Sequence, residues 1–314
     1  MKQPRMQSTG NKALFLALAA AGLLAALVCV AGSTRGRITF AREYARLADR
    51  WSRRWPLARG KGAVLRAAPL LSAIGMIPVR AEIEPGVSLL LDPRELVERV
   101  ILRDGEWEPE TWRAISAGLR EGADFLDVGA HIGYFTLRSA ARVGQSGLVV
   151  AFEPNPATVR LLRDNVAASH ASNVIIQPVA CTDHEQVVTL YDGPASNTGT
   201  ASLSRENADF FARKGDHHAS PHTVRGRPID DVVRELGLQR VDVVKVDVEG
   251  AEYYVLRGAF ETLRRFHPKL VVELIPRQLA GMQTKVEDVV SLLGEAGYNH
   301  SRRITRSNFE WTVQ

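Results

Sequence analysis

Through most of the chain, short apolar strand-like runs alternate with helical stretches, and this alternation restricts the fold more than any other feature. The runs Asp124–Val128, Leu148–Phe152 and Val174–Ala180 are rich in β-branched or aromatic residues. Stretches with helical periodicity separate them, at 134–143 and 156–169. Strands that alternate with helices form a parallel sheet with helices on both faces. The sequence therefore predicts an α/β fold.

Runs of both kinds continue before and after this region. We expect further strands at 79–83, 87–91, 187–191, 241–246 and 270–275, and further helices at 94–102, 109–119, 252–265 and 285–296. The last two runs, 298–304 and 309–313, are expected to add an antiparallel pair at the C-terminus. The stretch 192–221 is polar, lacks periodicity and is too long for a simple turn, so it is either a functional loop or disordered.

An uncharged run of nineteen residues, 13–31, lies near the N-terminus. As a helix it would be roughly 28 Å long, close to the ~30 Å hydrocarbon core of a bilayer. Three basic residues precede the run, and five arginines lie within the twenty residues after it. The positive-inside rule then predicts a single-pass anchor with the C-terminal bulk in the cytoplasm. A signal peptide cleaved near Ala31-Gly32-Ser33 and a misassigned start codon are the alternatives.

Charge divides the chain into three predicted parts. Segment 1–34 contains the transmembrane helix 13–31, segment 35–78 is a basic juxtamembrane helix or linker, and 79–314 is the main domain. The net charge is +5, but residues 1–31 carry +3 and residues 32–66 carry +8, which leaves −6 on the remainder. The basic segment either lies on anionic headgroups or is solvated. An acidic main domain excludes the basic footprint of a nucleic-acid binder.

A glycine-containing turn follows the strand at 124–128, in the order Asp127-Val-Gly129-Ala-His131-Ile-Gly133. Glycine lets the backbone approach a ligand closely, and the N-terminus of the next helix offers free N–H groups. The order lacks the second glycine of a dinucleotide fingerprint and the Lys-Ser/Thr ending of a P-loop. An acid beside such a turn suits a ligand that has a cationic amino group and no phosphate, as S-adenosylmethionine does. A tight turn without a ligand is the alternative.

Glu153 ends the next strand, in the sequence VVAFEPNP, 24 residues after Gly129. An acid at the end of the second strand is the usual partner of ribose hydroxyls in nucleoside-binding α/β folds, since a carboxylate accepts from both. Pro154 and Pro156 stop the strand and start the next helix. The alternative is a solvated glutamate at the end of a strand.

A third motif, VDVVKVDVEGAE, places Lys245, Asp247 and Glu249 at alternating positions where another strand ends. Ligands of open sheets lie beyond the carboxyl ends of the strands, so these side chains and Glu273 are candidates for a general base or metal ligands. We expect Lys245 to balance the carboxylates. Glu252 is either a further candidate of this kind or an ordinary acid that stabilises the N-terminus of a helix through the helix dipole.

Five segments resemble the FkbM-type methyltransferases: GEWEPETW, DVGAHIGYFT, AFEPNP, SNTGTASL and VDVVKVDVEGAEYYVLRGA. That family consists of S-adenosylmethionine-dependent enzymes with the class I Rossmann-like fold, and the resemblance covers roughly residues 79–276. It implies a mostly parallel sheet with an antiparallel C-terminal strand and helices on both faces. It also implies an O-methyltransferase that acts on a hydroxyl of a sugar, glycan or small metabolite.

The resemblance also implies roles for individual residues. Those expected to bind the cofactor are Asp127, Gly129, His131, Gly133, Glu153, Pro154, Asn155 and Asp183, the last near the adenine. The family often has asparagine where His131 stands. Asn197 and Thr200 lie in a recurrent loop segment and are expected to face the substrate.

Catalysis is expected from Asp247, Glu249 and Glu273. A hydroxyl acceptor is a weak nucleophile, and a base within ~3 Å contributes roughly 10²–10⁴-fold. A divalent cation that bridges these carboxylates is left open and is not predicted. The alternatives are a protein methyltransferase and a catalytically silent, membrane-anchored module. The sequence lacks the Asn/Asp-Pro-Pro-Tyr type of tetrad at Asp247, which argues against a nucleic-acid methyltransferase that acts on base nitrogens. It also lacks the second glycine of a dinucleotide fingerprint, which argues against an NAD oxidoreductase.

Overall fold

The computed structural model describes residues 36, 38–43, 78–210 and 221–313. Within these ranges no helix is long and apolar enough to cross a membrane. The anchor predicted at 13–31 and most of the basic segment lie outside them. Both therefore stay predictions.

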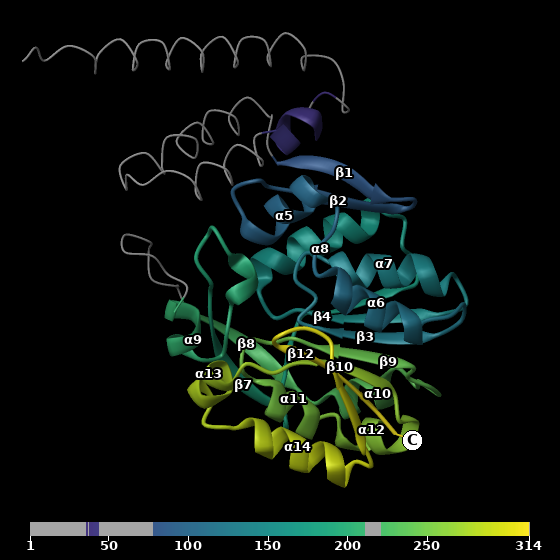
Figure 1. Cartoon of the computed structure of the whole chain (residues 1–314), viewed down its shortest axis with the longest axis vertical. Helices are drawn as coiled ribbons and strands as arrows, with labels where there is room; N and C mark the ends of the chain where they lie inside the picture. The colour runs from purple at the N-terminus through teal and green to yellow at the C-terminus, as the bar shows by residue number, and fades with distance from the viewer. Residues whose placement is uncertain (1–35, 37, 44–77, 211–220, 314) are drawn as a thin grey trace, which may run out of the picture.

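The described chain forms a β-hairpin, a seven-stranded sheet and a three-stranded sheet, connected by helices (Figure 1). The strands are β1 (Val79–Glu84), β2 (Val87–Leu91), β3 (Asp124–Val128), β4 (Leu148–Phe152), β5 (Val174–Gln177), β6 (Ala180–Cys181), β7 (Gln186–Tyr191), β8 (Pro221–Arg227), β9 (Val243–Val246), β10 (Lys269–Glu273), β11 (His300–Arg303) and β12 (Asn308–Thr312). The helices are α5 (Leu96–Asp104), α6 (Pro109–Gly118), α7 (Tyr134–Val143), α8 (Pro156–Ala168), the 3₁₀ turn η1 (Thr198–Thr200), α9 (Arg205–Phe210), α10 (Ile229–Glu235), α11 (Glu252–Arg257), α12 (Phe260–Phe266), α13 (Pro276–Gly281) and α14 (Val286–Glu295).

The seven-stranded sheet has the order β11-β12-β10-β9-β3-β4-β5. β12 pairs antiparallel with both neighbours, whereas the β10-β9, β9-β3, β3-β4 and β4-β5 pairs are parallel. This confirms the mostly parallel sheet with an antiparallel C-terminal strand. The strand order reverses between β3 and β9, and ligands of doubly wound sheets bind at such a reversal.

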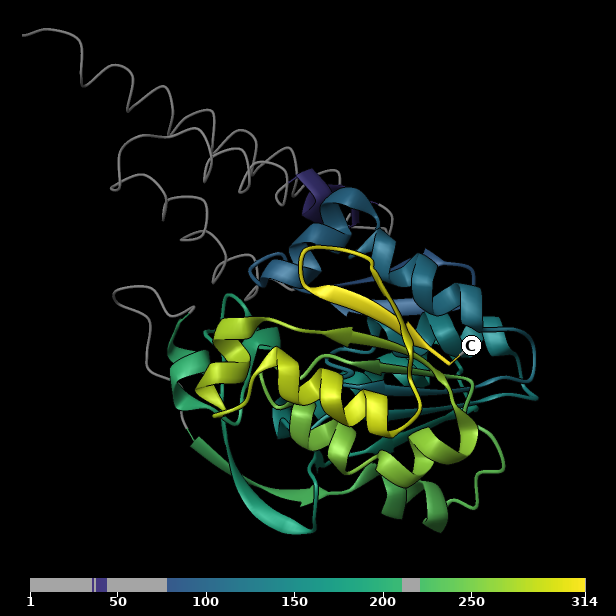
Figure 2. The same cartoon turned by 60° about the horizontal axis from the view of Figure 1, so that its bottom comes forward.

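Helices cover both faces of this sheet (Figure 2). Successive residues of β3 point to opposite faces, so Phe125 and Leu126 enter different hydrophobic clusters. The Leu126 cluster contains apolar side chains of α10, α11, α12 and α14. The Phe125 cluster contains those of α5, α6, α7 and the β1-β2 hairpin. The predicted α/β fold is therefore confirmed.

Three predicted segments differ in the structure. The run 174–180 divides, because Pro178 has no N–H for the ladder; β5 stays in the central sheet and β6 joins the small one. The helix predicted at 252–265 breaks at Gly258, where a Cβ would lie 2.0 Å from the carbonyl oxygen of Thr182. The aperiodic stretch 192–221 contains η1 and α9, and β8 begins at Pro221.

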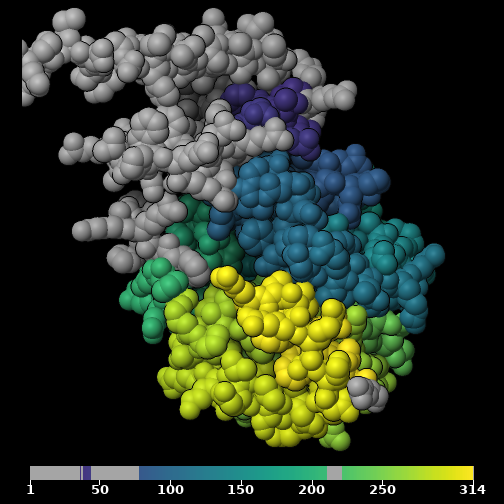
Figure 3. Space-filling model, in the orientation of Figure 1, coloured from purple at the N-terminus to yellow at the C-terminus, as the bar shows by residue number. Residues whose placement is uncertain are grey.

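Residues 38–43 are helical and pack on the main domain, although they belong to the predicted juxtamembrane segment. Ala41 is fully buried and lies in the same hydrophobic cluster as the β1-β2 hairpin, with Ile38 packed against it. Figure 3 shows these purple residues beside the blue surface of the domain. This part of the basic segment therefore belongs to the hydrophobic core of the hairpin.

Candidate active site

A cavity of about 280 Å³ opens at the carboxyl ends of β3, β4, β9 and β10. It brings together most of the predicted site residues: Gly129, His131, Glu153, Pro154, Asn197, Thr200, Asp247, Glu249 and Glu273. Four other predicted cofactor residues do not line it, namely Asp127, Gly133, Asn155 and Asp183.

The glycines of the turn are required by packing. Gly129 has a φ of +81°, and a Cβ there would lie 1.9 Å from the carbonyl oxygen of Asp247. Gly133 has a φ of +91°, and its Cβ would lie 2.6 Å from Cδ1 of Leu162 on α8. The first glycine thus lets the turn after β3 meet the end of β9, and the second lets α7 meet α8. Gly129 also lines the cavity, so its predicted approach to a ligand stays a prediction.

Asp127 lies behind the turn, fully buried. Its Oδ2 accepts a hydrogen bond from the Thr136 hydroxyl at 2.6 Å, and its Oδ1 lies 3.8 Å from Nζ of Lys245. Burial raises the pKa of Asp127, and Lys245 opposes that shift. Asp127 therefore positions Lys245 and the first turn of α7, and it does not line the cavity as a direct cofactor contact would.

Glu153 faces the cavity from the end of β4. Its two oxygens accept from the backbone N–H groups of His131 and Asn155, each at 2.9 Å. Burial raises the pKa of Glu153 to about 7. Each oxygen keeps a further lone pair, which suits the two hydroxyls of a ribose. Asn155 caps α8 by accepting hydrogen bonds from the backbone N–H groups of Ala157 and Thr158. It therefore holds the start of α8 next to the cavity without lining the cavity itself.

The predicted substrate loop is joined to the turn by His131, whose Nε2 lies 2.9 Å from the Thr198 hydroxyl. Burial lowers the pKa of His131 to about 4, so the ring is neutral at neutral pH. The backbone N–H of Thr198 donates to Glu95 at 3.1 Å. The Thr200 hydroxyl donates to the Asn197 carbonyl at 2.9 Å, which ties it to its own loop.

Asp183 lies outside the cavity, paired with His184 at 2.8 Å and Arg257 at 3.6 Å. The neighbouring Val179, Ala180 and Cys181 line the cavity instead. They give it an apolar section on the β4 side, which fits a planar nucleobase. Cys181 is a buried free cysteine.

Lys245 is buried at the centre of the site. Its Nζ lies 3.3 Å from Asp247 Oδ2 and donates to the Gly129 carbonyl at 3.3 Å. Burial by itself would lower the pKa of Lys245, but the carboxylates of Asp247, Asp127 and Glu108 outweigh it and raise that pKa. The ammonium group is therefore charged and fully engaged, as expected of a residue that balances carboxylates.

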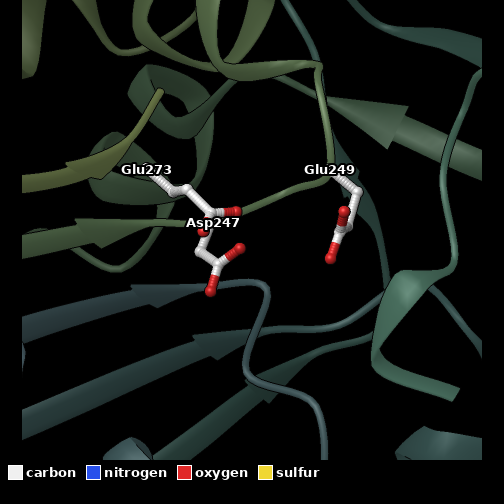
Figure 4. Close-up of side chains that lie close together, drawn as sticks. All are labelled: Asp247, Glu249 and Glu273. Atoms are coloured by element: carbon white, nitrogen blue, oxygen red, sulfur yellow. The ribbon is translucent and has the colours of Figure 1, made fainter. Parts of the chain in front are cut away.

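Asp247, Glu249 and Glu273 form an acidic group, with one carboxylate oxygen of each within 4.8 Å of the others (Figure 4). Ser307 donates to Glu273 at 3.0 Å, and the Gln278 amide donates to Glu249. Burial and the neighbouring acids raise the pKa of Glu273 to about 10 and the pKa of Glu249 well above its usual range. Glu273 is therefore protonated at neutral pH and can donate a hydrogen bond. In their ionised form, three carboxylates this close together would also suit a hard divalent cation.

Glu252 accepts from the backbone N–H groups of Val248 and Gly250, at 3.2 and 3.1 Å. It is buried and absent from the cavity wall. Its contacts hold the turn between β9 and α11, which is the structural role considered for it in the sequence.

The protonated state of Glu273 predicts a pH-dependent effect of Glu273→Gln. The unfolded chain loses this proton near its ordinary value of 4.5, whereas the folded chain keeps it up to about 10. The free energy of unfolding of the wild type should therefore fall between these values, by at most about 1.4 kcal/mol per pH unit from this group. We expect the glutamine variant to gain stability relative to wild type from pH 6 to pH 9, measured by urea unfolding. If the free energy of unfolding changed with pH in the same way for both proteins, Glu273 would not be protonated in the folded chain as assigned.

Glu108, Thr198 and Gln278 also line the cavity, although no role was predicted for them from the sequence. Glu108 stands in the quoted segment GEWEPETW, directly before the proline that begins α6. In the sequence, that acid-proline pair is the one local feature that singles out Glu108. Thr198 lies between Asn197 and Thr200 in the quoted segment SNTGTASL. Gln278 comes from α13, a helix that was not predicted from the sequence.

A doubly wound sheet with one inserted antiparallel strand, and with carboxylates gathered at its switch point, is the fold of the class I S-adenosylmethionine-dependent methyltransferases. The family model described as the methyltransferase FkbM domain matches residues 127–299. The chain belongs to this family, which confirms the resemblance seen in the sequence.

Over the aligned segments, three curated relatives are between a quarter and a third identical to this chain. AMB antimetabolite synthetase AmbE of Pseudomonas aeruginosa is 28% identical over 57% of this chain, which spans only 10% of AmbE. Hexuronic acid methyltransferase AglP of Haloferax volcanii is 29% identical over 66% of this chain and 75% of AglP. The 31-O-demethyl-FK506 methyltransferase FkbM of Streptomyces tacrolimicus is 31% identical over 45% of this chain and 60% of that protein.

Proposed function

We propose that this chain transfers a methyl group from S-adenosylmethionine to a hydroxyl of a sugar, glycan or related small metabolite. The observation that carries the proposal is Asp247, a carboxylate on the cavity wall that is ion-paired with buried Lys245 and directly follows β9. The names of two relatives, a hexuronic acid methyltransferase and a 31-O-demethyl-FK506 methyltransferase, support an acceptor of this kind.

S-Adenosylmethionine, when bound, supplies a methyl group on a positively charged sulfur. Asp247 would accept the proton of the acceptor hydroxyl and so make that oxygen a better nucleophile toward the methyl group. Lys245 fixes the carboxylate of Asp247 through its 3.3 Å contact. Protonated Glu273 can donate to a second oxygen of the acceptor, which orients it for an in-line displacement.

The test is methyl transfer by the full-length chain with methyl-labelled S-adenosylmethionine. The acceptors are neutral sugars, hexuronic acids, macrocyclic alcohols, a mixed protein extract and total RNA. We expect label in a hydroxyl-bearing small molecule, in a linkage that survives mild alkali. Label in protein alone would favour a protein methyltransferase. No transfer to any acceptor by a protein that binds the cofactor would favour the silent binding module.

A further inference from the structure

One carboxylate on the cavity wall has no assigned task. Glu108 precedes α6 with a backbone in the left-handed region, φ 44° and ψ 62°. Acidic residues before a helix normally accept from its first N–H groups, but the Glu108 side chain makes no capping hydrogen bond. The side chain is thus available to the cavity that it lines.

The Oε2 oxygen of Glu108 is buried and has no hydrogen-bond partner among the described residues. Burial raises the pKa of Glu108, and nearby Asp247 raises it further. A buried carboxylate oxygen without a donor is costly, and such groups are normally satisfied by a partner. The Lys245 ammonium group and the Thr111 hydroxyl oppose this rise in pKa in part, and the Oε2 oxygen still has room for a donor that comes with a ligand.

No cation of the described cavity wall is left to serve Glu108. Lys245 is the one lysine or arginine among those lining residues, and its ammonium group is already held by Asp127, Asp247 and the Gly129 carbonyl. The ring of His131 is neutral at neutral pH, because burial lowers its pKa to about 4. The donor must therefore come with a ligand, and a cationic donor matches the charge.

The segment before α6 is held rigidly, so Glu108 is preorganised. The Trp107 N–H donates to the Tyr134 hydroxyl at 3.0 Å, and Arg138 donates to the same hydroxyl at 2.7 Å. The Arg138 guanidinium also lies 4.2 Å from the ring centre of Trp112 on α6. These contacts join the start of α6 to α7, the helix that follows the glycine turn.

We propose that Glu108 binds the α-ammonium group of S-adenosylmethionine and so determines which end of the cavity receives the amino acid part of the cofactor. The ammonium group supplies the missing donor and a positive charge. Glu153 then receives the ribose at the other end of the same wall. This assignment depends on the cofactor of the family and holds for any methyl acceptor.

The test is calorimetric titration of the full-length chain and its Glu108→Gln variant with two ligands. One is S-adenosylhomocysteine, which carries the ammonium group. The other is its deaminated analogue, 5′-S-(3-carboxypropyl)-5′-thioadenosine, which differs by that group alone. A charge-assisted hydrogen bond of this kind corresponds to roughly 10–100-fold in affinity. We expect Glu108→Gln to lower the affinity for S-adenosylhomocysteine by that factor. Its affinity for the deaminated analogue should stay within about threefold of the wild-type value.

Glu110→Gln is the matched control, since Glu110 is exposed on the first turn of α6 and pairs with Arg113 on the surface. It should leave both affinities unchanged. Equal losses for the two ligands in Glu108→Gln would show a merely structural role, and no loss for either would place Glu108 elsewhere; both overturn the proposal. A wild type that binds neither ligand would overturn the cofactor site itself.

Discussion

Gly129→Ala is expected to abolish binding of S-adenosylhomocysteine and to lower the free energy of unfolding by roughly 3 kcal/mol or more. A Cβ at this position would lie 1.9 Å from the Asp247 carbonyl oxygen, so the turn after β3 must separate from the end of β9. Those two segments carry the backbone of the cofactor turn and the proposed base. Chemical unfolding and calorimetric titration measure the two effects.

Gly86→Ala is the control for this prediction. Gly86 has the same φ of +81°, but a Cβ added there would have no other atom within 4 Å. The backbone strain alone should cost about 1 kcal/mol, and ligand binding should be unchanged. If Gly129→Ala lowered the free energy of unfolding and the ligand affinity no more than Gly86→Ala does, the close contact between the turn after β3 and the end of β9 would be contradicted.

Asp247→Asn should reduce the rate of methyl transfer by roughly 10²–10⁴-fold, the usual contribution of a general base. Asparagine keeps the size of the side chain and cannot take the proton of the acceptor hydroxyl. Affinity for S-adenosylhomocysteine should fall far less than the rate, because asparagine keeps the size of the side chain on the cavity wall. Single-turnover rates with the acceptor found in the panel separate these effects.

Asp183→Asn provides the contrast. Asp183 was expected near the adenine, but its side chain pairs with His184 and Arg257 outside the cavity. Its loss should change neither the rate nor the cofactor affinity by more than about threefold. An Asp247→Asn enzyme that kept more than a tenth of the wild-type rate would exclude Asp247 as the base.

The elements around the turn could be predicted from the sequence almost residue for residue. β3, α7 and β4 have the predicted bounds, because each combines strong periodicity with a glycine or proline at its end. β8 and α10 were missed, because β8 contains Arg225 and Gly226 and is stabilised by its pairing with β7 and β6. Tertiary pairing of that kind leaves no local signature.

The side chains of the site were harder to predict than its elements. Glu153 and Asp247 were placed correctly on the cavity wall, because strand ends of a parallel sheet meet at one edge. Asp127 also ends a strand, but its side chain is buried behind the turn. The motif indicates where the strand ends and does not indicate how deeply the side chain is buried. Glu108 reaches the wall from a helix that precedes β3 in the chain, which only the packing of α6 on the sheet determines.

The most direct test of the cofactor site is calorimetric titration of S-adenosylhomocysteine into the full-length chain and its Glu153→Ala variant. Glu185→Ala serves as control, since Glu185 is an exposed acid paired with Arg225. We predict micromolar binding by the wild type and the control, and at least a tenfold loss in Glu153→Ala, about 1.4 kcal/mol or more. Undiminished affinity in Glu153→Ala would contradict the assignment of this cavity to the nucleoside of the cofactor.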